Sequence, residues 1–378
     1  RQKQGIDILK LNTGNPATFG FGLPDSIKNA LIEHMQDGVG YCDFKGMPQA
    51  RQAICDYETS KGIKGITSDD VFIGNGVSEV VSFALTPLLN DGDEVLVPSP
   101  SYSLWGNSVY LEDGKPVFYT CDEQANWYPD IQDIRSKITD KTKAIVIINP
   151  NNPTGVLYPK ELLLEIIQIA RESGLLIFAD EIYDRLVMDG KQHISLASLT
   201  EDVPVITLNG LSKSHCLCGY RCGWMVISGP RELTEDYRQG IIQLTSLRLC
   251  ANTLAQIVIP AALDDMDTPA SMVRPGGRIY EQREATVREL EKIDGLSFVK
   301  NDAAFYVFPK LDVKKFNITN DKQFAHDLLD ATNILLVPGS GFDWKDPDHF
   351  RIVMLPQADI LSDAIRRMGT FLDGYKQK

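Results

Sequence analysis

The chain has 378 residues, of which 43% are hydrophobic and 24% are charged. This composition is ordinary for a folded protein and excludes a disordered, collagen-like or coiled-coil chain, and the length predicts two domains. The net charge is −13, from 38 lysines and arginines against 51 acidic residues. It argues against a nucleic-acid partner, because affinity for a phosphate backbone comes from massed basic side chains.

The sequence also predicts where the protein resides. No apolar run approaches the roughly 20 residues of a membrane-spanning helix, so we expect no membrane partner. Asp7 and Lys10 interrupt the start of the chain, which therefore lacks the pattern of a secretory signal peptide. The 7 cysteines are scattered and odd in number, as in proteins that keep free thiols in a reducing compartment. We therefore expect a cytoplasmic protein.

Apolar runs and helical patterns alternate along most of the chain. Nearly continuous apolar character indicates strands that are covered on both faces, as in a mostly parallel sheet. The alternation predicts an α/β fold, with a large domain in which helices flank this sheet. Strands are predicted at residues 71–73, 94–97, 143–148, 175–179, 205–208 and 224–227, and helices at 77–89 and 160–173.

The C-terminal part has a different pattern. A long charged helix is predicted at residues 278–294, and separate strands at 304–308 and 334–337. The turn Arg274-Pro275-Gly276-Gly277 marks a domain boundary, because proline and glycine end regular elements. We predict a large domain over residues 41–274, a smaller α+β domain over 275–378, and an N-terminal segment, 1–40, that belongs to the smaller domain.

Polar groups follow the predicted strands. Residues 74–78 follow the first strand and Asn149 to Gly155 the third, while Asp180 to Tyr183 and Asn209 to Lys213 follow the next two. Ligands of open α/β sheets bind at the carboxyl ends of the strands, so we expect these groups to converge. Pyridoxal 5′-phosphate (PLP) would use them all. Its aldehyde needs a lysine amine, its ring nitrogen a carboxylate, and its phosphate a helix N-terminus and a cation.

Several short motifs resemble one family. The chain is similar to aminotransferases of classes I and II, with the PLP transferase fold type I, over nearly its whole length. The resemblance implies a large domain with a sheet of the seven-stranded type and a smaller domain. It rests on Gly14-Asn15-Pro16, Tyr41 with Gly46 and Arg51, Asn152-Pro153-Thr154-Gly155, Asp180-Glu181-Ile182-Tyr183, Ser212-Lys213, Gly219-Tyr220-Arg221 and Phe350-Arg351-Ile352.

The resemblance also implies a role for each matching residue. The catalytic residues would be Lys213, which forms a Schiff base with PLP, Asp180, which pairs with the ring nitrogen, and Tyr183. Arg351 would bind the substrate carboxylate, helped by Gly14 and Asn152. Gly210 stands where many relatives carry a phosphate-binding serine, which leaves that contact open. The cofactor-binding set would be Lys213, Val77, Ser78, Tyr102, Asn152, Asp180, Tyr183, Ser212, Arg221 and, from a partner subunit of a homodimer, Tyr41.

Longer matches point to bacterial alanine (glutamate–pyruvate) aminotransferases. The matching segments are residues 11–16, 40–43, 73–79 and 209–213. The resemblance therefore implies that the enzyme converts L-alanine and 2-oxoglutarate to pyruvate and L-glutamate in two half-reactions of the ping-pong type. Two alternatives share the same cofactor site. One is an aminotransferase for aspartate, aromatic or branched-chain substrates, and the other is a PLP-dependent β-lyase or decarboxylase.

Three other functions fit the sequence less well. A nicotinamide oxidoreductase would carry a third glycine in the turn that begins at Gly74. A regulator built on this fold would need an added DNA-binding segment. The cysteines and histidine at residues 215–222 lack the paired spacing of a zinc site, and Lys213 and Arg221 would repel a cation. We therefore predict no metal.

Overall fold

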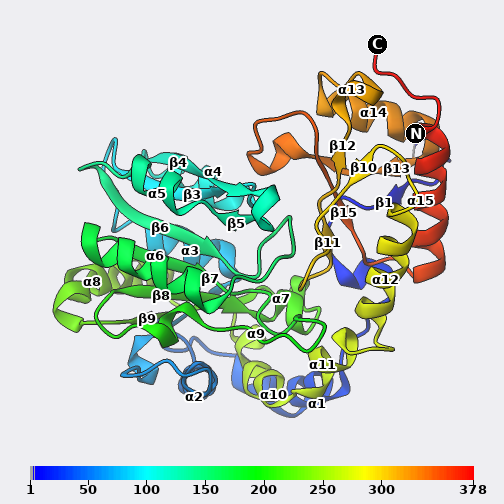
Figure 1. Ribbon diagram of the computed structural model, residues 1–378. Coiled ribbons are helices and arrows are strands. Elements are labelled where there is room, and N and C mark those ends of the chain that lie inside the picture. Colours follow the sequence, from blue (N-terminus) through cyan, green and yellow to red (C-terminus); the bar gives the residue numbers. More distant parts are fainter. Residues whose placement is uncertain (1–2, 4) are drawn as a thin grey trace.

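The structure, a computed structural model, describes residue 3 and residues 5–378. An eight-stranded sheet lies on one side of the molecule, and a group of short strands with two long helices lies on the other (Figure 1). In spatial order, the strands of the large sheet are β2 (Val71–Asn75), β9 (Cys222–Ser228), β8 (Val205–Gly210), β7 (Leu176–Asp180), β6 (Thr142–Ile148), β3 (Glu94–Ser99), β4 (Lys115–Asp122) and β5 (Tyr128–Pro129).

The large sheet confirms the predicted α/β class. Strands β8, β7, β6, β3 and β4 run parallel to one another, whereas β9 pairs antiparallel with both β8 and β2. Two features were not predicted: β4, and the two-residue strand β5, which pairs antiparallel with the end of β4 and makes an eighth strand. The carboxyl ends of the five parallel strands lie at one edge of the sheet, and this edge positions the site.

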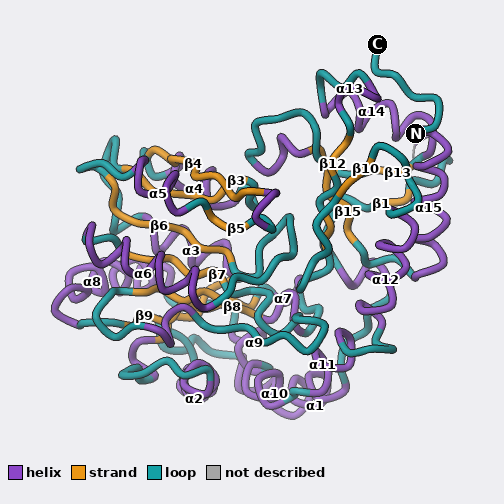
Figure 2. The backbone as a smooth tube through the Cα atoms, in the orientation of Figure 1, coloured by secondary structure: helices purple, strands orange, loops and turns teal. Residues whose placement is uncertain are grey.

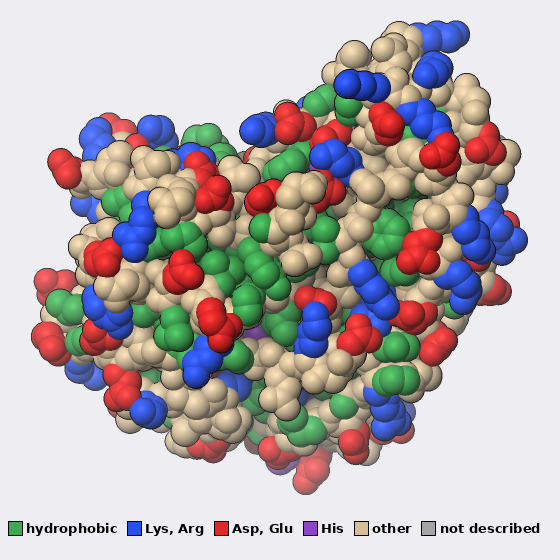
Figure 3. Space-filling view, in the orientation of Figure 1, with side chains coloured by type: hydrophobic (Ala, Val, Ile, Leu, Met, Phe, Trp, Pro, Cys, Tyr) green, Lys and Arg blue, Asp and Glu red, His purple; other side chains and the backbone are tan. Residues whose placement is uncertain are grey.

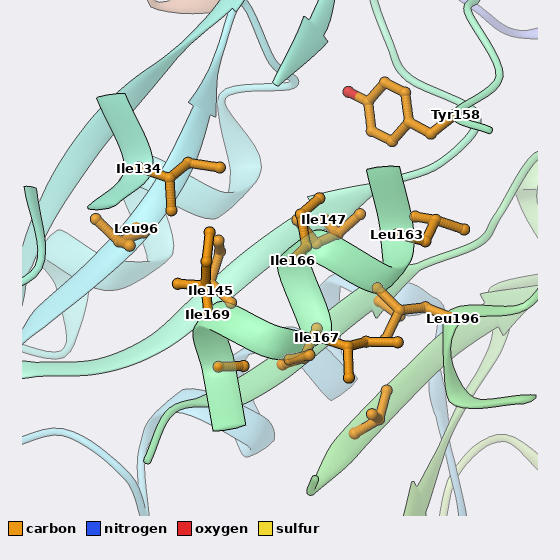
Figure 4. Close-up of a cluster of buried hydrophobic side chains, with 14 of the residues drawn as sticks. Leu96, Ile134, Ile145, Ile147, Tyr158, Leu163, Ile166, Ile167, Ile169 and Leu196 are labelled. Atoms are coloured by element: carbon orange, nitrogen blue, oxygen red, sulfur yellow. The ribbon is translucent and has the colours of Figure 1, made fainter. Parts of the chain in front are cut away.

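Helices cover both faces of this sheet, which explains its continuous apolar strands. Along β6, Ile145 and Ile147 pack on one face of the sheet against α6 (Lys160–Ser173) and α5 (Ile131–Lys137) (Figure 4). Val146 and Ile148 are buried on the opposite face of the sheet. The helices along the chain are α1 (Asp25–His34), α2 (Pro48–Ser60), α3 (Val77–Leu85), α4 (Leu104–Leu111), α5 (Ile131–Lys137), α6 (Lys160–Ser173), α7 (Leu211–Ser214), α8 (Arg231–Arg248), α9 (Thr253–Ile257), α10 (Ile259–Asp264), α11 (Asp267–Val273), α12 (Arg278–Leu290), α13 (Val313–Phe316), α14 (Asp321–Thr332) and α15 (Ala358–Leu372).

The C-terminal strands are shorter than predicted. The strand expected at 304–308 is reduced to two residues, because Ala304 has a φ of 59° and leaves the extended conformation. The strand expected at 334–337 is two strands with different partners, β13 beside β1 and β14 beside β15. The strands here are β1 (Leu9–Lys10), β10 (Leu296–Ser297), β11 (Tyr306–Val307), β12 (Lys310–Leu311), β13 (Ile334–Leu335), β14 (Val337–Pro338) and β15 (Phe350–Val353).

The N-terminal segment contacts both parts of the molecule. Its strand β1 pairs with β13 in the C-terminal part, while Ile27 of α1 is buried among side chains of α2, α10 and the large sheet. The assignment of residues 1–40 to the smaller domain, like the other domain boundaries, stays a prediction.

The face of the molecule in view carries both charged and apolar side chains. Acidic and basic side chains are interspersed there, with apolar side chains between them (Figure 3). Across the described part of the chain, no helix has both the length and the apolar character that a membrane crossing requires.

Loops and the short helix α7 occupy the region between the large sheet and the C-terminal strands (Figure 2).

Candidate active site

A cavity of about 360 Å³ lies at the carboxyl ends of the parallel strands. Every predicted site residue except Tyr41 lines it. Its walls also contain residues that the sequence did not single out, among them Asn12, Cys218 and Tyr306. The predicted residues in the wall are Gly14, Val77, Ser78, Tyr102, Asn152, Asp180, Tyr183, Ser212, Lys213, Arg221 and Arg351.

Asp180 ends strand β7 at the wall of the cavity. The Trp105 indole nitrogen donates to its Oδ2 over 3.0 Å, and the backbone nitrogen of Ile182 donates to its Oδ1 over 3.4 Å. Burial raises the pKa of Asp180 to about 6, although the hydrogen bond from Trp105 opposes this shift. Among the described residues, no basic side chain forms an ion pair with Asp180. The carboxylate would therefore gain from a cation inside the cavity.

Lys213 lies in α7, which begins directly after strand β8. Its Nζ donates to the backbone oxygen of Gly14 over 2.9 Å and lies 3.9 Å from the Cys218 sulfur. A Cβ atom at Gly14 would overlap the Tyr306 hydroxyl and lie 3.2 Å from the Phe305 ring. Only glycine therefore leaves these two side chains in place. Gly14 thus holds the amine through its backbone and leaves space for a phenol.

Two tyrosine hydroxyls meet at the cavity wall. The hydroxyl oxygens of Tyr183 and Tyr306 are 2.8 Å apart, and both side chains are buried. Burial, together with the neighbouring phenol, raises the pKa of Tyr183 well above its ordinary value. Tyr183 is therefore a neutral hydrogen-bond donor. The sequence did not predict Tyr306, whose apolar surroundings along the chain resemble a plain core strand.

Arg351 reaches the cavity from β15. Its Nη1 donates to Asn152 Oδ1 over 2.9 Å and its Nη2 to the backbone oxygen of Asn12 over 2.6 Å. The guanidinium also lies over the rings of Tyr306 and Phe342, 4.5 and 4.6 Å from their centroids. Within the described residues, its buried Nε has no hydrogen-bond partner. A planar guanidinium whose Nε still has a hydrogen to donate is well suited to bind a carboxylate.

The N-terminus of α3 and Arg221 face the same space. Gly76 precedes the helix with a φ of +85°, and a Cβ atom there would overlap the Arg221 guanidinium. Arg221 donates to the backbone oxygens of Cys218 and Asn75, over 3.0 and 3.4 Å. The first backbone N–H groups of a helix lack intrahelical partners and favour anions. Together with the guanidinium, they can hold a phosphate.

Two predicted features need comment. Tyr41 is 83% exposed and lines a separate hollow with Cys250 and Thr253, so it does not reach the cavity of its own chain. At Gly210, a Cβ atom would lie 2.6 Å from the backbone oxygen of Cys222, so a serine does not fit without a backbone shift. The phosphate contact that a serine would supply must come from other groups.

The residues in the wall fit PLP. Asp180 is a buried acid without a counter-charge, and Arg351 Nε and Asn12 Oδ1 are buried without partners in the part of the chain that the structure describes. An amine, a phenol and an anion cradle face the same space. Such a set defines an enzyme that binds an aldehyde coenzyme with a cationic ring and a carboxylate substrate.

Comparisons with known proteins give the family. Residues 6–365 match the family model for aminotransferases of classes I and II. A glutamate–pyruvate aminotransferase, AlaA, from Haemophilus influenzae is 51% identical across the whole chain and 93% of its own length. An alanine aminotransferase from Mycobacterium tuberculosis is 46% identical across the whole chain and 88% of its length. An aminotransferase structure from Escherichia coli has a TM-score of 0.98 at 48% identity, covering the whole chain and 93% of that protein.

The chain therefore belongs to the class I and II aminotransferases and is a PLP-dependent enzyme. This confirms the fold type, the enzyme class and the cofactor that the motifs implied.

Proposed function

We propose that this enzyme transfers the amino group of L-alanine to 2-oxoglutarate, which gives pyruvate and L-glutamate. The observation that carries the proposal is the convergence of Lys213, Asp180 and Arg351 on one cavity. The relatives that are about half identical over the full chain are named for glutamate–pyruvate and alanine transamination. Alternatives are a different amino-acid range and a PLP-dependent β-lyase.

The residues would hold the coenzyme at four points. Asp180 would pair with the cationic ring nitrogen, and the pyridinium would in turn keep this buried carboxylate ionised. Tyr183 and Asn152 would donate to the phenolate oxygen, while Tyr102 would cover the ring face. The phosphate would lie against Arg221 and the backbone of Val77, Ser78 and Ser212, which share the cavity wall.

Arg351 would bind the substrate, and Lys213 would transfer the proton. Arg351 would accept the substrate carboxylate in place of its present partners, Asn152 and the Asn12 backbone. When bound, PLP supplies a carbonyl carbon that takes up the amino group and a ring that withdraws electrons from Cα. Lys213, once its amine is free, would carry the proton away from Cα as a general base.

We also propose that two copies form the active unit. Tyr41 and Val39 are 83% and 77% exposed and line a hollow with residues 250–253. The residues on either side of that segment, Leu249 and Leu254, are also exposed apolar side chains. A water-facing cluster of this kind is common where another chain binds. The resemblance assigns Tyr41 to the phosphate of the partner's site.

The 7 cysteines, all free and all within the described residues, remain the basis for a cytoplasmic location.

The main test is turnover with defined substrates. The purified enzyme with PLP should show a visible absorbance band that alanine changes, and initial rates should give parallel double-reciprocal lines. Lys213→Ala should lower turnover by about 10⁴-fold, whereas Lys64→Ala, an exposed lysine outside the cavity, should leave it unchanged. Faster turnover of aspartate, tyrosine or leucine than of alanine would contradict the substrate assignment. Product formed without an oxo acid would indicate a lyase.

A mixing experiment tests the shared site. Lys213→Ala and Tyr41→Ala variants are each expected to be impaired, but a mixed dimer would contain one intact site. Recovered activity after mixing, in dimers measured by light scattering, is the expected result. Monomers with full activity would overturn the proposal.

A further inference from the structure

A cluster of buried charges lies behind the cavity, on the loop that follows β7. Lys61, just after α2, is at its centre. The Lys61 Nζ lies 2.8 Å from Glu58, 2.7 Å from Glu181 and 3.1 Å from Asp184. The lysine side chain is 13% exposed, and the three carboxylate side chains are 0 to 3% exposed. One ammonium therefore holds three buried acids from two separate segments of the chain.

Neutral donors complete the cluster. Asp184 also accepts from the Tyr57 hydroxyl over 2.5 Å and from Asn209 Nδ2 over 2.7 Å. Glu181 also accepts from the Ser195 hydroxyl over 2.9 Å. Asn209 belongs to β8, the strand that leads into Lys213. The cluster thus joins the end of α2 to the ends of β7 and β8.

The cluster and the cavity share one loop. Asp180 and Tyr183 face the cavity, while Glu181 and Asp184, each the next residue along the chain, face Lys61. Anchoring Glu181 and Asp184 from behind fixes the backbone that carries Asp180 and Tyr183. A small displacement of such groups lowers rates, because positioned side chains act only in a narrow range of geometry.

The electrostatics favour a fixed arrangement. Burial alone would lower the pKa of Lys61, but Glu181, Glu58 and Asp184 together raise it well above its ordinary value. Lys61 is therefore charged at all ordinary pH values. Removing it would leave three buried acids facing one another without their shared cation, which is costly in a low-dielectric interior.

A metal ion is a poorer explanation of this cluster. Glu181, Asp184 and His193 offer ligand atoms within 4.8 Å of one another, with no ion present. However, the Lys61 ammonium already contacts both of these carboxylates and would repel a second cation. The lysine occupies the place that a metal would need.

We propose that Lys61 is a positioning residue for the cofactor site, which holds Asp180 and Tyr183 in place by anchoring Glu181 and Asp184. The proposal rests on the function proposed above, since it assumes that Asp180 and Tyr183 contact PLP.

The test compares Lys61→Met with Lys61→Arg and Lys64→Met. Lys64 is a matched control because it is a nearby lysine that forms an ion pair with Glu201 and is 69% exposed. We expect Lys61→Met to weaken PLP binding and to lower kcat by about 10- to 100-fold, with little change in the KM for alanine. Lys61→Arg should restore most of both values, and Lys64→Met should match the wild type. PLP affinity is measured by titrating the apo-protein, whose thermal unfolding is recorded in parallel.

Two results would overturn the proposal. One is a folded Lys61→Met protein with wild-type PLP affinity and kcat. The other result is needed if Lys61→Met does not fold. In that case the variant to test is Tyr57→Phe, which removes only one donor to Asp184. Unchanged PLP affinity and kcat in Tyr57→Phe would also reject the proposal. A two- to fivefold loss in both would support it. Failure of the proposed function is distinct, since it would appear as absent alanine turnover in the wild type.

Discussion

Asp180, the last residue of β7, and Asp184, four residues further along the chain, are both buried, yet their environments are opposite. Burial raises the pKa of Asp180 to about 6, and no basic side chain of the described residues pairs with it. For Asp184, burial has the same effect, but Lys61, His193 and the Tyr57 hydroxyl outweigh it, and the pKa lies below its ordinary value. Lys61 gives Asp184 a counter-charge on the side of the chain that faces away from the cavity, which we call the rear face. Asp180, on the cavity face, has no such partner among the described residues. A buried acid without a counter-charge favours the binding of a ligand that carries a positive charge.

Among the predictions that follow from this comparison, the largest expected effect tests the acid that faces the cavity. Asp180→Asn keeps the shape of the side chain but removes the charge that would stabilise a cationic ring. We expect kcat/KM for alanine to fall by about 10²–10³-fold, measured in steady state with saturating PLP. Asp184→Asn provides the comparison and should lose much less activity per folded molecule. Equal losses would show that the two faces do not differ in function.

The second prediction concerns pH and the apo-protein. Because the folded pKa of Asp180 is raised from 3.8 to about 6, the folded state binds this proton more tightly than the unfolded state. The resulting stability is fully present below pH 3.8 and is lost as the pH rises through about 6, by about 3 kcal/mol. Urea unfolding at pH 4 and pH 7 should show that Asp180→Asn lacks this loss. Added PLP should reduce it in the wild type.

The third prediction tests the rear face through stability. Asp184→Asn should lower the free energy of unfolding at pH 7 by about 1–3 kcal/mol, because Lys61 and the Tyr57 hydroxyl lose their charged acceptor. The lowered pKa of Asp184 gives the opposite pH dependence to that of Asp180, since its contribution is present above its ordinary pKa and is lost in acid. Urea titrations at pH 4 and pH 7 measure both effects. A variant as stable as the wild type at pH 7 would refute the pairing.

The smallest effect expected from this comparison concerns Arg351, which reaches the cavity from β15. Arg351→Lys keeps the charge but loses the fork that now engages Asn152 and the Asn12 backbone. The KM for alanine should rise by about tenfold, in the range of one lost charge-assisted hydrogen bond, with a smaller change in kcat. The absorbance of bound PLP should not change. An altered PLP spectrum would mean that Arg351 also contributes to the environment of Asp180.

The sequence predicted the cavity face better than the rear face. Apolar runs located β6, β7 and β8, and each run is followed by polar residues that line one cavity: Asn152 after β6, Asp180 and Tyr183 at the end of β7, and Ser212 and Lys213 after β8. The helix predicted at 160–173 has these bounds in the structure. Lys61 gave no such signal, because a lysine after a helical pattern normally lies in solvent, and its three acids come together only through packing of α2 against the loop after β7. Hydroxyl and indole partners such as Tyr306 and Trp105 were missed for the same reason.

The indole bond to Asp180 gives the molecule an intrinsic optical reporter. Trp105 is fully buried, packs against Phe178 with ring centroids 5.2 Å apart, and donates directly to the acid at the cavity wall. A change of charge or occupant at that acid alters the electric field across the indole. We therefore expect tryptophan emission from this position to change as the cofactor binds, without any label attached to the protein.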